Sequence, residues 1–430
     1  MASYNPKMHL FTEMKTDVTN ENISWIDVRP TNVIDKNTEV VDFFIPKNTN
    51  VFWDLSRSYM EITAKVVNKD DSTMVSDLKV GVINSLGSTM WRTVETTINQ
   101  YQFGSNPNLY HLQCYLENLL TTTQDAKNSY MQSQLWFVDS PGLLNISDPE
   151  QGNEGYKQRY EFTRGSQQFK MAVPIHHDLF MQPKYLLSGC ELGLRMYRAN
   201  DKFILMNGEA TGEPKLTLID MNLKLCQITP SMEVASHIEK HLHSKPAIYN
   251  IYQTAMHKFT VPTASPSFTV DNLYPAMKLP DIVVVAFFKV DNVNGNYKNS
   301  PLDMSHHSVS SIGLYVDSIP TPQRPYKLNF AALEAMDGYM SIFNQFNLFG
   351  SDKSNHFGIN AYIQQFTCYA FSLTRSASGN SSNTNAEGRQ GVVKIEVAFA
   401  KPTGEQLYMV VMSKTAAILS LDKSRQISIT

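Results

Sequence analysis

Residues Tyr59–Val67 read YMEITAKVV, a stretch in which apolar and polar side chains alternate. Successive side chains of a β-strand point to opposite faces, so this alternation predicts a strand with one buried and one wet face. The preceding segment Val40–Pro46, VVDFFIP, is rich in residues that favour strands, and Trp91–Asn99, WRTVETTIN, continues the pattern. The chain therefore begins its fold with three predicted strands.

A helical segment follows these strands. Asn106-Pro107 is a helix start signal, and five leucines recur after it at helical spacing: Leu109, Leu112, Leu116, Leu119 and Leu120. A second short helix is predicted over Thr123–Leu135. Beyond a polar loop, strands return at Phe169–Ile175, Cys190–Tyr197 and Leu216–Ile228.

The second half of the chain repeats this order. Its predicted strands are Ala247–Val261, Ile282–Val290, Val309–Val316, Phe366–Leu373, Val392–Phe399 and Leu407–Met412. After the third of them, helical spacing appears at Phe330, Leu333, Met336, Met340 and Phe343. The shared order predicts an all-β fold class: two tandem antiparallel β domains of about 200 residues each, with helices in long loops.

Boundaries follow from the breaks between these patterns. We expect an N-terminal arm over 1–35, a first β domain over 36–230, a connector helix over 231–246, a second β domain over 247–420 and a C-terminal tail over 421–430. The connector is predicted because Pro230 precedes SMEVASHIEKHLHSK, with a helix start at Ser231.

The composition limits the classes of function. The chain has 430 residues with 42% hydrophobic and 18% charged residues, which is enough apolar mass for folded cores and excludes disorder as the main state. Lys plus Arg (37) nearly balances Asp plus Glu (40), giving a net charge of −3. No global field steers the protein onto nucleic acid or an anionic membrane, so any such contact has to be local.

Cys114, Cys190, Cys226 and Cys368 form no CxxC pair. This spacing excludes a zinc ribbon and a dithiol redox motif, and we expect all four to be reduced and mostly buried. The N-terminus has no apolar segment of signal-peptide length, and the longest apolar run, Ile282–Phe288, is too short for a membrane span. Synthesis and folding in the cytosol are expected.

Three histidine pairs are candidate metal ligands. His237 and His241 are four residues apart, but Ile238 stands where the zinc-protease pattern needs a glutamate, so we predict a polar surface helix there. His176-His177 and His306-His307 are adjacent and point to opposite faces of a strand, which disfavours chelation. Although Asp178 and Asp303 lie nearby, we interpret these histidines as solvated or hydrogen-bonded.

Other motifs also fail to indicate chemistry. GxGxxG, GxxxxGK[ST] and GxSxG are absent from the sequence. Asp70-Asp71 lies in the turn-like NKDDS segment and is interpreted as a solvated hairpin tip. The basic and aromatic run 155–165, GYKQRYEFTRG, carries too few cations for a dedicated nucleic-acid binder, and we interpret it as a loop-to-strand junction. We therefore expect no catalytic residue, cofactor site or metal site.

Several segments together resemble a known family. They are Asp42–Val66 (DFFIPKNTNVFWDLSRSYMEITAKV), Tyr110–Lys127 (YHLQCYLENLLTTTQDAK), Asn153–Gly165 (NEGYKQRYEFTRG), His177–Gly189 (HDLFMQPKYLLSG), Gly338–Phe343 (GYMSIF) and Leu419–Arg425 (LSLDKSR). In this order, across nearly the whole chain, they resemble the double jelly-roll capsid proteins of Polinton/Maverick elements and adintovirus-like double-stranded DNA viruses, including uncharacterised invertebrate genomic copies.

The resemblance implies that both β domains are jelly-roll β-sandwiches of a structural major capsid protein. Such subunits form homotrimers, which are pseudo-hexagonal capsomers of an icosahedral shell around double-stranded DNA. The expected partners are further copies of the chain and minor capsid and penton proteins, with DNA contacted only weakly or indirectly. The protein would reside in the virion capsid after synthesis in the host cytoplasm, and the nucleus is a candidate place of assembly.

The same resemblance suggests places for the irregular segments. Helical segments 107–135 and 328–346 would lie near subunit contacts, and polar loops 140–156 and 376–388 on the exposed outer side. The arm and tail would reach neighbours or minor proteins beneath the shell.

Two other functions compete with this interpretation. A minor capsid or spike protein would use a β-sandwich to bind a host protein or glycan. A lectin would be expected to expose Trp, yet the chain has four Trp in all, and Trp91 lies in a predicted strand while Trp53 lies shortly before another. A β-rich enzyme is disfavoured by the missing motifs.

Overall fold

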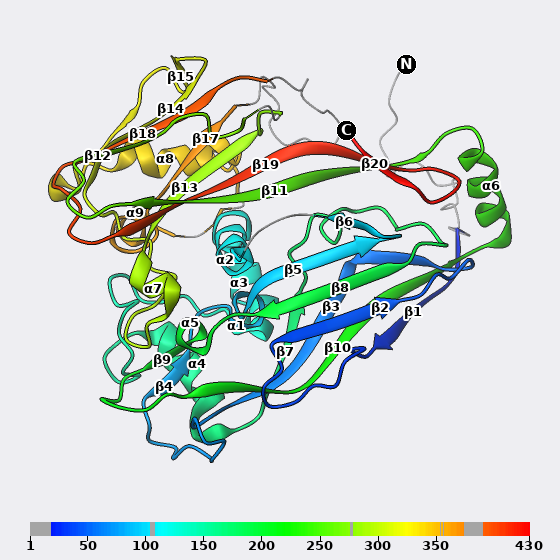
Figure 1. Cartoon of the computed structure of the whole chain (residues 1–430), viewed down its shortest axis with the longest axis horizontal. Helices are drawn as coiled ribbons and strands as arrows, with labels where there is room; N and C mark the ends of the chain where they lie inside the picture. Colours follow the sequence, from blue (N-terminus) through cyan, green and yellow to red (C-terminus); the bar gives the residue numbers. More distant parts are fainter. Residues whose placement is uncertain (1–18, 104–107, 276–277, 353, 356, 374–389) are drawn as a thin grey trace, which may run out of the picture.

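The computed structural model describes residues 19–430 apart from 104–107, 276–277, 353, 356 and 374–389. The chain forms two β-sandwiches, one below the other in Figure 1. Helix α6 (Met232–Leu242) lies beside their junction and connects them, beginning directly after Ser231 as predicted.

The first sandwich consists of two four-stranded antiparallel sheets. Their strand orders are β1-β10-β3-β7 and β2-β8-β5-β6. The strands are β1 (Asn20–Val28), β2 (Val40–Ile45), β3 (Phe52–Val67), β5 (Trp91–Ile98), β6 (Tyr101–Phe103), β7 (Phe169–Pro174), β8 (Leu192–Arg198) and β10 (Lys215–Pro230). A separate pair is formed by β4 (Val80–Val82) and β9 (Leu205–Asn207).

The second sandwich is built in the same way. Its sheets have the orders β11-β19-β13-β17, with β20 added to β19, and β12-β18-β14-β15, with β16 added to β14. The strands are β11 (Ala247–Val261), β12 (Ser267–Val270), β13 (Ile282–Lys289), β14 (Val309–Val316), β15 (Ile319–Pro320), β16 (Tyr326–Lys327), β17 (Cys368–Ser372), β18 (Val393–Phe399), β19 (Leu407–Leu421) and β20 (Ile427–Ile429).

Both sandwiches have jelly-roll topology. When β4, β9, β16 and β20 are omitted and the remaining strands are numbered along the chain within each sandwich, both give the orders 1-8-3-6 and 2-7-4-5. Two facing antiparallel sheets with these crossovers define a jelly roll. The predicted fold class is confirmed, and we call residues 19–230 roll 1 and residues 247–430 roll 2.

The repeat is offset from the predicted alignment of the two halves. The first strand of roll 1, β1, and the second strand of roll 2, β12, both went unpredicted. β1 is half-exposed along its length and β12 has only four residues, so neither carries the strong apolar pattern on which strand prediction depends.

Helices occupy equivalent connections in the two rolls. Between β6 and β7 lie α2 (Tyr110–Thr121), α3 (Gln124–Lys127), the 3₁₀ helix η2 (Tyr130–Gln134), α4 (Glu154–Thr163) and η3 (Arg164–Ser166). Between β16 and β17 lie η4 (Phe330–Ala332), α8 (Met336–Gln345) and α9 (Ile359–Gln364). The shorter helices α1 (Leu86–Thr89), α5 (Asp201–Ile204) and α7 (Val290–Gly295) lie in other loops. Helices in long loops are thus confirmed.

Two predicted helices are divided in the structure. The helix expected over Thr123–Leu135 is split into α3 and η2. The helical spacing from Phe330 to Phe343 is broken at Leu333, whose φ of 59° is left-handed and ends η4 before α8 begins.

Burial along the strands explains the sequence patterns. In β3, Met60, Ile62, Ala64 and Val66 are buried while the residues between them are partly exposed, as the alternation predicts. In β13 all residues from Ile282 to Phe288 are buried, because one face of its sheet packs inside roll 2 and the other faces α2 of roll 1 (Figure 1).

The predicted loop-to-strand junction at 155–165 is wrong, because Glu154–Thr163 forms helix α4. The Asn153 side chain accepts a hydrogen bond from the backbone N–H of Tyr156 and caps the helix. Tyr156 and Arg159 are buried on the face of α4 that packs against the core. The sequence pattern did not indicate a helix, because the buried face of α4 carries a cation and aromatic side chains instead of aliphatic ones.

Both predicted chain ends take part in sheets. Within the predicted arm, Asn20–Val28 forms β1 and pairs with β10; the rest of the arm before residue 19 lies outside the described residues. Within the predicted tail, Ile427–Ile429 forms β20 and pairs with β19. Each of these segments therefore pairs with one strand of its own chain, at the edge of a sheet.

One of the two predicted outer loops contacts roll 2. In loop 140–156, the Asn145 side-chain amide donates to Asp303 (2.8 Å), and the backbone N–H of Ser300 donates to Asn145 (2.9 Å). Its placement on the outer side of a shell stays a prediction. Loop 376–388 lies outside the described residues.

We predict that β1 contributes to stability. Ile26 and Val28 are partly buried against the core, and burial of two such side chains is worth about 2–4 kcal/mol. A chain lacking residues 1–28 should be less stable by that amount than one lacking residues 1–18, measured by urea unfolding. Equal midpoints for the two truncations would contradict this role of β1.

Candidate functional site

A buried ion pair joins the two rolls. Glu117, on α2 of roll 1, has a side chain that is 1% exposed, and its Oε1 lies 2.9 Å from Nζ of Lys414 on β19 of roll 2. The two elements that carry these residues, α2 and β19, lie on the two sides of the junction in Figure 1. Roll 1 thus supplies the negative charge of this buried pair and roll 2 the positive charge.

A second carboxyl group lies beside this pair. Asp178 follows β7 of roll 1 and accepts two hydrogen bonds from Thr254 on β11 of roll 2. The Thr254 hydroxyl donates to Oδ1 (3.0 Å) and its backbone N–H to Oδ2 (3.2 Å). Asp178 also lines a cavity of about 460 Å³ with Phe103, Ile251 and Gln253. The junction is therefore polar and partly open to water.

His176 completes the cluster from the roll 1 side. Its Nδ1 lies 3.5 Å from Oε2 of Glu117, and its side chain is 8% exposed. We call Glu117, His176, Asp178, Thr254 and Lys414 the junction cluster. It contains two acids, one histidine and one lysine, all facing one another across the interface between the rolls.

The electrostatics of the cluster have identifiable causes. Burial by itself would raise the pKa of Glu117, but Lys414 and His176 outweigh it and lower that pKa to about 2. Burial would lower the pKa of Lys414, but Glu117 raises it. Burial followed by repulsion from Glu117 raises the pKa of Asp178 to about 7. The ion pair is thus charged at neutral pH, while Asp178 titrates there.

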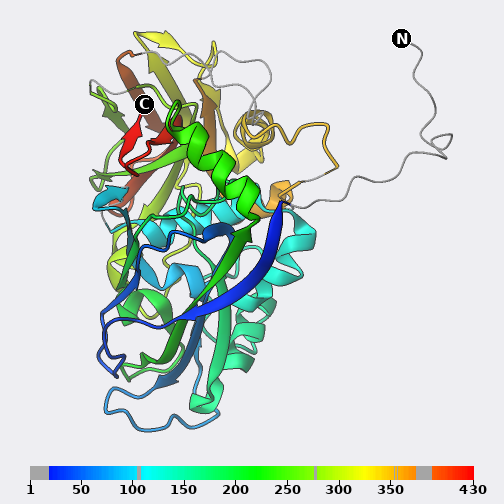
Figure 2. The same ribbon diagram turned by 90° about the vertical axis from the view of Figure 1, so that its right-hand side faces the viewer.

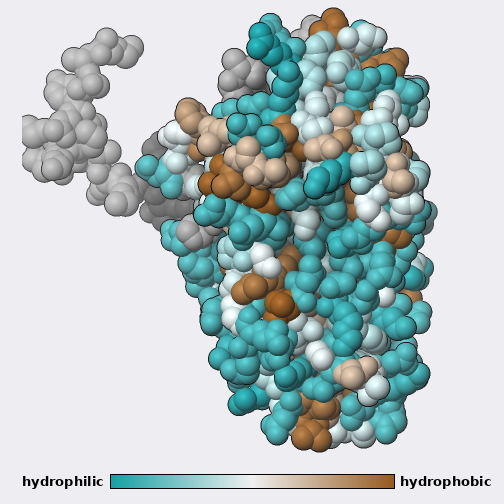
Figure 3. All heavy atoms as spheres, turned by 90° about the vertical axis from the view of Figure 1, so that its left-hand side faces the viewer, coloured by the Kyte–Doolittle hydropathy of each residue, from teal (hydrophilic) through white to brown (hydrophobic). Residues whose placement is uncertain are grey.

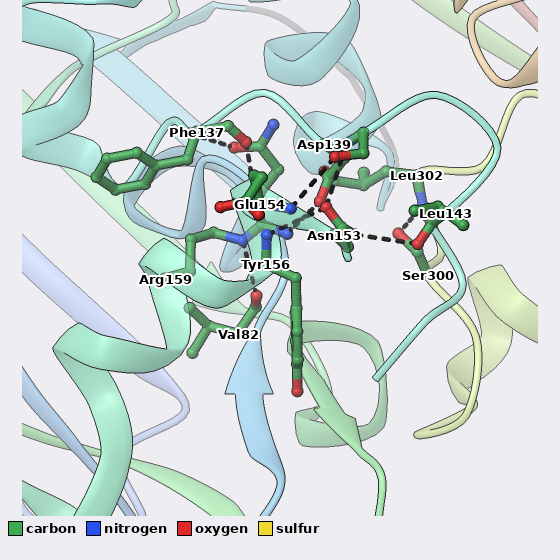
Figure 4. A network of polar contacts seen from close by, with 12 residues as sticks. Val82, Phe137, Asp139, Leu143, Asn153, Glu154, Tyr156, Arg159, Ser300 and Leu302 are labelled. Atoms are coloured by element: carbon green, nitrogen blue, oxygen red, sulfur yellow. Dashed lines mark hydrogen bonds and ion pairs between the residues drawn. The ribbon is translucent and has the colours of Figure 1, made fainter. Parts of the chain in front are cut away.

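A network around Arg159 supports the junction from within roll 1 (Figure 4). The Arg159 guanidinium donates to the carbonyl oxygens of Val82 (3.0 Å) and Phe137 (2.8 Å) and to Oδ1 of Asp139 (2.7 Å). Asn153 also donates to Asp139 Oδ1, at 2.9 Å. The side chains of Arg159 and Asp139 are 2% and 1% exposed, so this cation and its carboxylate are almost fully removed from solvent.

The Arg159 network extends to roll 2 through the backbone of Asp139. The Gln365 side-chain amide of roll 2 donates to the carbonyl oxygen of Asp139 at 3.1 Å. Asp139 belongs to the same loop region as Asn145, whose side-chain amide donates a hydrogen bond to Asp303 of roll 2. A buried arginine therefore orients roll 1 groups that contact roll 2.

Lys127 forms a third connection between the rolls. Its Nζ donates to the carbonyl oxygens of Leu119 and of Asn355 in roll 2, each at 2.7 Å. Burial lowers its pKa to about 7. Several polar connections thus hold the two rolls in one arrangement, among them the Glu117–Lys414 ion pair, the Lys127 ammonium group and the loop that the Arg159 network orients.

The other histidine candidates lie apart from this cluster. His241 Nδ1 lies 2.9 Å from the carbonyl oxygen of His237, on the surface helix α6. His306 stacks on Phe330 with ring centroids 4.3 Å apart. Among the described residues, no group of three or more His, Cys, Asp or Glu is placed to hold a metal ion.

The remaining sequence candidates have structural roles. Asp71 forms ion pairs with Lys215 (2.7 Å) and Lys36 (3.6 Å). It lies in a turn, as predicted, but the expected hairpin is wrong, because β3 before it and β4 after it belong to different sheets. The four cysteines are buried and free, as predicted. In the described part of the chain, no helix has the length and apolar character to cross a membrane.

Sequence reasoning noticed His176 and Asp178 but missed Glu117, Lys414, Arg159 and Lys127. The sequence feature that could have indicated Glu117 and Lys414 is a charged residue within an otherwise apolar helix or strand. Glu117 interrupts the leucine face of α2, and Lys414 interrupts the apolar strand β19, LYMVVMSKTAAILSL. A buried charge needs a partner, but the partner cannot be chosen from the sequence.

The molecule thus has the double jelly-roll fold, two rolls in tandem fixed by buried polar contacts. No protein-family model matches the chain. It is 21% identical over 400 residues to the uncharacterized protein F54H12.2 of Caenorhabditis elegans, covering 89% of this chain and 91% of that protein.

Solved structures of viral capsids are similar to the whole chain. A chain of the Sputnik virophage has a TM-score of 0.66 and 12% identity, covering 100% of this chain and 92% of its own. The Faustovirus major capsid protein has a TM-score of 0.61 and 9% identity, with 96% and 93% covered. The mavirus major capsid protein has a TM-score of 0.59 and 11% identity, with 99% and 93% covered. The predicted double jelly-roll fold is confirmed at the level of architecture.

We predict that Lys414→Met destabilises the protein by about 3–5 kcal/mol, because it leaves Glu117 charged and buried without its main partner. Urea unfolding measures the change. Glu117→Gln/Lys414→Met should recover part of the loss. As a matched control, Lys69→Met breaks the exposed pair with Glu213, whose side chains are 77% and 47% exposed, and should cost less than about 1 kcal/mol. Equal effects of the two lysine changes would refute the role of the ion pair.

We predict a pH-dependent contribution from Asp178. Its ordinary pKa is 3.8 and its pKa in the folded protein is about 7. Between these values the folded state holds a proton that the unfolded state has released, so this group lowers stability as pH rises. Buried His177 and His307 act in the opposite sense, because burial lowers their pKa values to about 4.

The Asp178 contribution is therefore isolated by comparison with Asp178→Asn. The free energy of unfolding of the variant relative to the unmodified chain should increase from pH 5 to pH 8. Asp70→Asn is the control, because burial is absent and Ser72 lowers the pKa of Asp70. Parallel stability curves for Asp178→Asn and the unmodified chain would show that Asp178 does not titrate in this range.

Proposed function

We propose that this chain is a structural major capsid protein. The observation that carries the proposal is a whole-length match of two jelly rolls, in one rigid arrangement, to capsid proteins of Faustovirus and mavirus. The polar connections between the rolls support it, because a shell subunit has to transmit contact forces between its halves without changing shape.

Two similar rolls in one chain suit a particular assembly. Three copies around a threefold axis present six similar walls, which gives a pseudo-hexagonal capsomer. Closed threefold symmetry requires head-to-tail contacts, in which roll 1 of one copy meets roll 2 of the next. Such capsomers would tile an icosahedral shell around double-stranded DNA.

The surface is compatible with packing in many copies. The net charge of −3 avoids strong repulsion between like subunits. Figure 3 shows one face as mainly hydrophilic with separate hydrophobic patches. On roll 2, Leu333, Met336 and Phe349 are 68%, 56% and 71% exposed. Exposed apolar side chains in this helical segment favour its placement at a subunit contact.

The same proposal includes the lineage and the location. The similarity to a nematode protein of near-equal extent fits the Polinton/Maverick and adintovirus-like group, whose capsid genes have invertebrate genomic copies. The protein would be made in the host cytoplasm and reside in the virion capsid, with minor capsid and penton proteins as further partners.

We predict that the purified chain forms trimers with three times the 48.7 kDa mass of one chain, because a double jelly roll completes its capsomer only in threes. Light scattering after size exclusion measures the mass, and negative-stain imaging shows capsomers or spherical particles. A monodisperse monomer at micromolar concentration would count against a major capsid role and favour a spike or binding module.

A further inference from the structure

Strand β1 forms an open edge of roll 1. In the sheet order β1-β10-β3-β7 it stands at the end, and among the described residues it pairs only with β10. Figure 2 shows β1 running along the outside of roll 1, below α6. One side of its backbone therefore presents N–H and C=O groups outward.

The centre of this edge lacks the usual protection against strand pairing. Its residues Asn22–Ile26, NISWI, contain no charge and no Pro; Glu21 and Asp27 flank them, and the one register shift of β1 lies between Asn20 and Asn22. Ile23 and Trp25 are 48% and 44% exposed. Folded proteins normally shield edge strands with charges, prolines or bulges. A long, regular and partly apolar edge is suited to adding another strand.

A charge on β1, Glu21, and one directly after its last residue, Arg29, identify a partner and a register. Glu21 and Arg29 are exposed and have no ion-pair partner in the described part of the chain, whereas Asp27 pairs with Lys224 at 2.6 Å. Antiparallel pairing of two copies centred on Trp25 sets Glu21 of each copy opposite Arg29 of the other. Pairing centred on Ser24 would instead set Glu21 opposite Asp27, which is repulsive. The first register is therefore favoured.

We propose that the β1 strands of two copies of this chain pair antiparallel across a twofold axis at Trp25, forming one continuous sheet. This deepens the proposed capsid function and rests on it, because it names the surface that joins neighbouring capsomers. A twofold contact uses the same patch on both copies, whereas the threefold contact within a capsomer joins different patches. The two contacts can therefore coexist on one subunit.

Trp25 is held in place as the centre of this contact. Its ring lies 5.7 Å from the ring of Tyr59 and 5.7 Å from the Arg57 guanidinium. An aromatic anchor that is already ordered loses little side-chain entropy on binding and can dominate an interface. On the symmetry axis it meets its own counterpart.

A charge-swap experiment tests the register. Glu21→Arg or Arg29→Glu alone places like charges opposite each other twice per contact, and should weaken association between capsomers roughly tenfold. Glu21→Arg/Arg29→Glu restores opposite charges and should restore association. Circular dichroism and thermal melting verify the fold, and light scattering measures association. Single variants that assemble like the unmodified chain would overturn the proposal.

Cysteine cross-linking tests the contact independently of shell formation. Glu21→Cys/Arg29→Cys should give disulfide-linked dimers of chains on mild oxidation. The two positions are eight residues apart in an extended strand, about 26 Å, so they cannot link within one chain. Glu21→Cys/Asp27→Cys is the matched control and should cross-link only in the register centred on Ser24.

The outcomes separate this inference from the proposed function. Cross-linked dimers of the first variant without any particles would support the strand pairing and count against the capsid role. Particles from the unmodified chain, together with no cross-linking of the first variant, would support the capsid role and overturn the strand pairing. Cross-linking of the control alone would overturn the Trp25 register.

Discussion

The pairing of a buried acid on one roll with a buried lysine on the other constrains the whole molecule. Glu117 on α2 and Lys414 on β19 are both largely removed from water, and a buried charge is tolerated only beside an opposite charge and hydrogen-bond donors. Separation of the rolls would leave both charges without their partner. The two jelly rolls are therefore coupled thermodynamically, although each has its own sheets, and their buried apolar residues form one continuous core.

The other connections repeat this principle with different chemistry. Lys127 satisfies its ammonium group with carbonyl oxygens from both rolls. The Arg159 guanidinium fixes the carbonyl oxygens and the carboxylate of loops that reach roll 2. Directional hydrogen bonds allow few relative orientations of the rolls, whereas apolar contact alone would allow more. This fixed orientation distinguishes the double jelly roll from two sandwiches on a flexible linker.

Local patterns predicted most strands because the pattern itself is a local property. The alternation in β3 and the apolar run of β13 follow directly from which faces are covered. The same reasoning missed β1, whose side chains stay half-exposed at the sheet edge. It also read α4 as a loop, because Arg159 and Tyr156 are buried by distant partners. Errors thus fall where an element stays exposed at a sheet edge or where its burial depends on residues far away in the chain.

The sequence by itself determined the all-β class, the tandem repeat, the long helical connections and the near-neutral net charge, whereas it predicted 12 strands and the described residues form 20. These properties depend on the periodicity of apolar residues and on composition, which are visible in the sequence itself. Only the tertiary structure decided that Glu117 meets Lys414, that Arg159 is enclosed, and that β1 closes one sheet and leaves an edge open. Such pairings join residues that are remote in sequence, and no local pattern encodes which buried charge will find which partner.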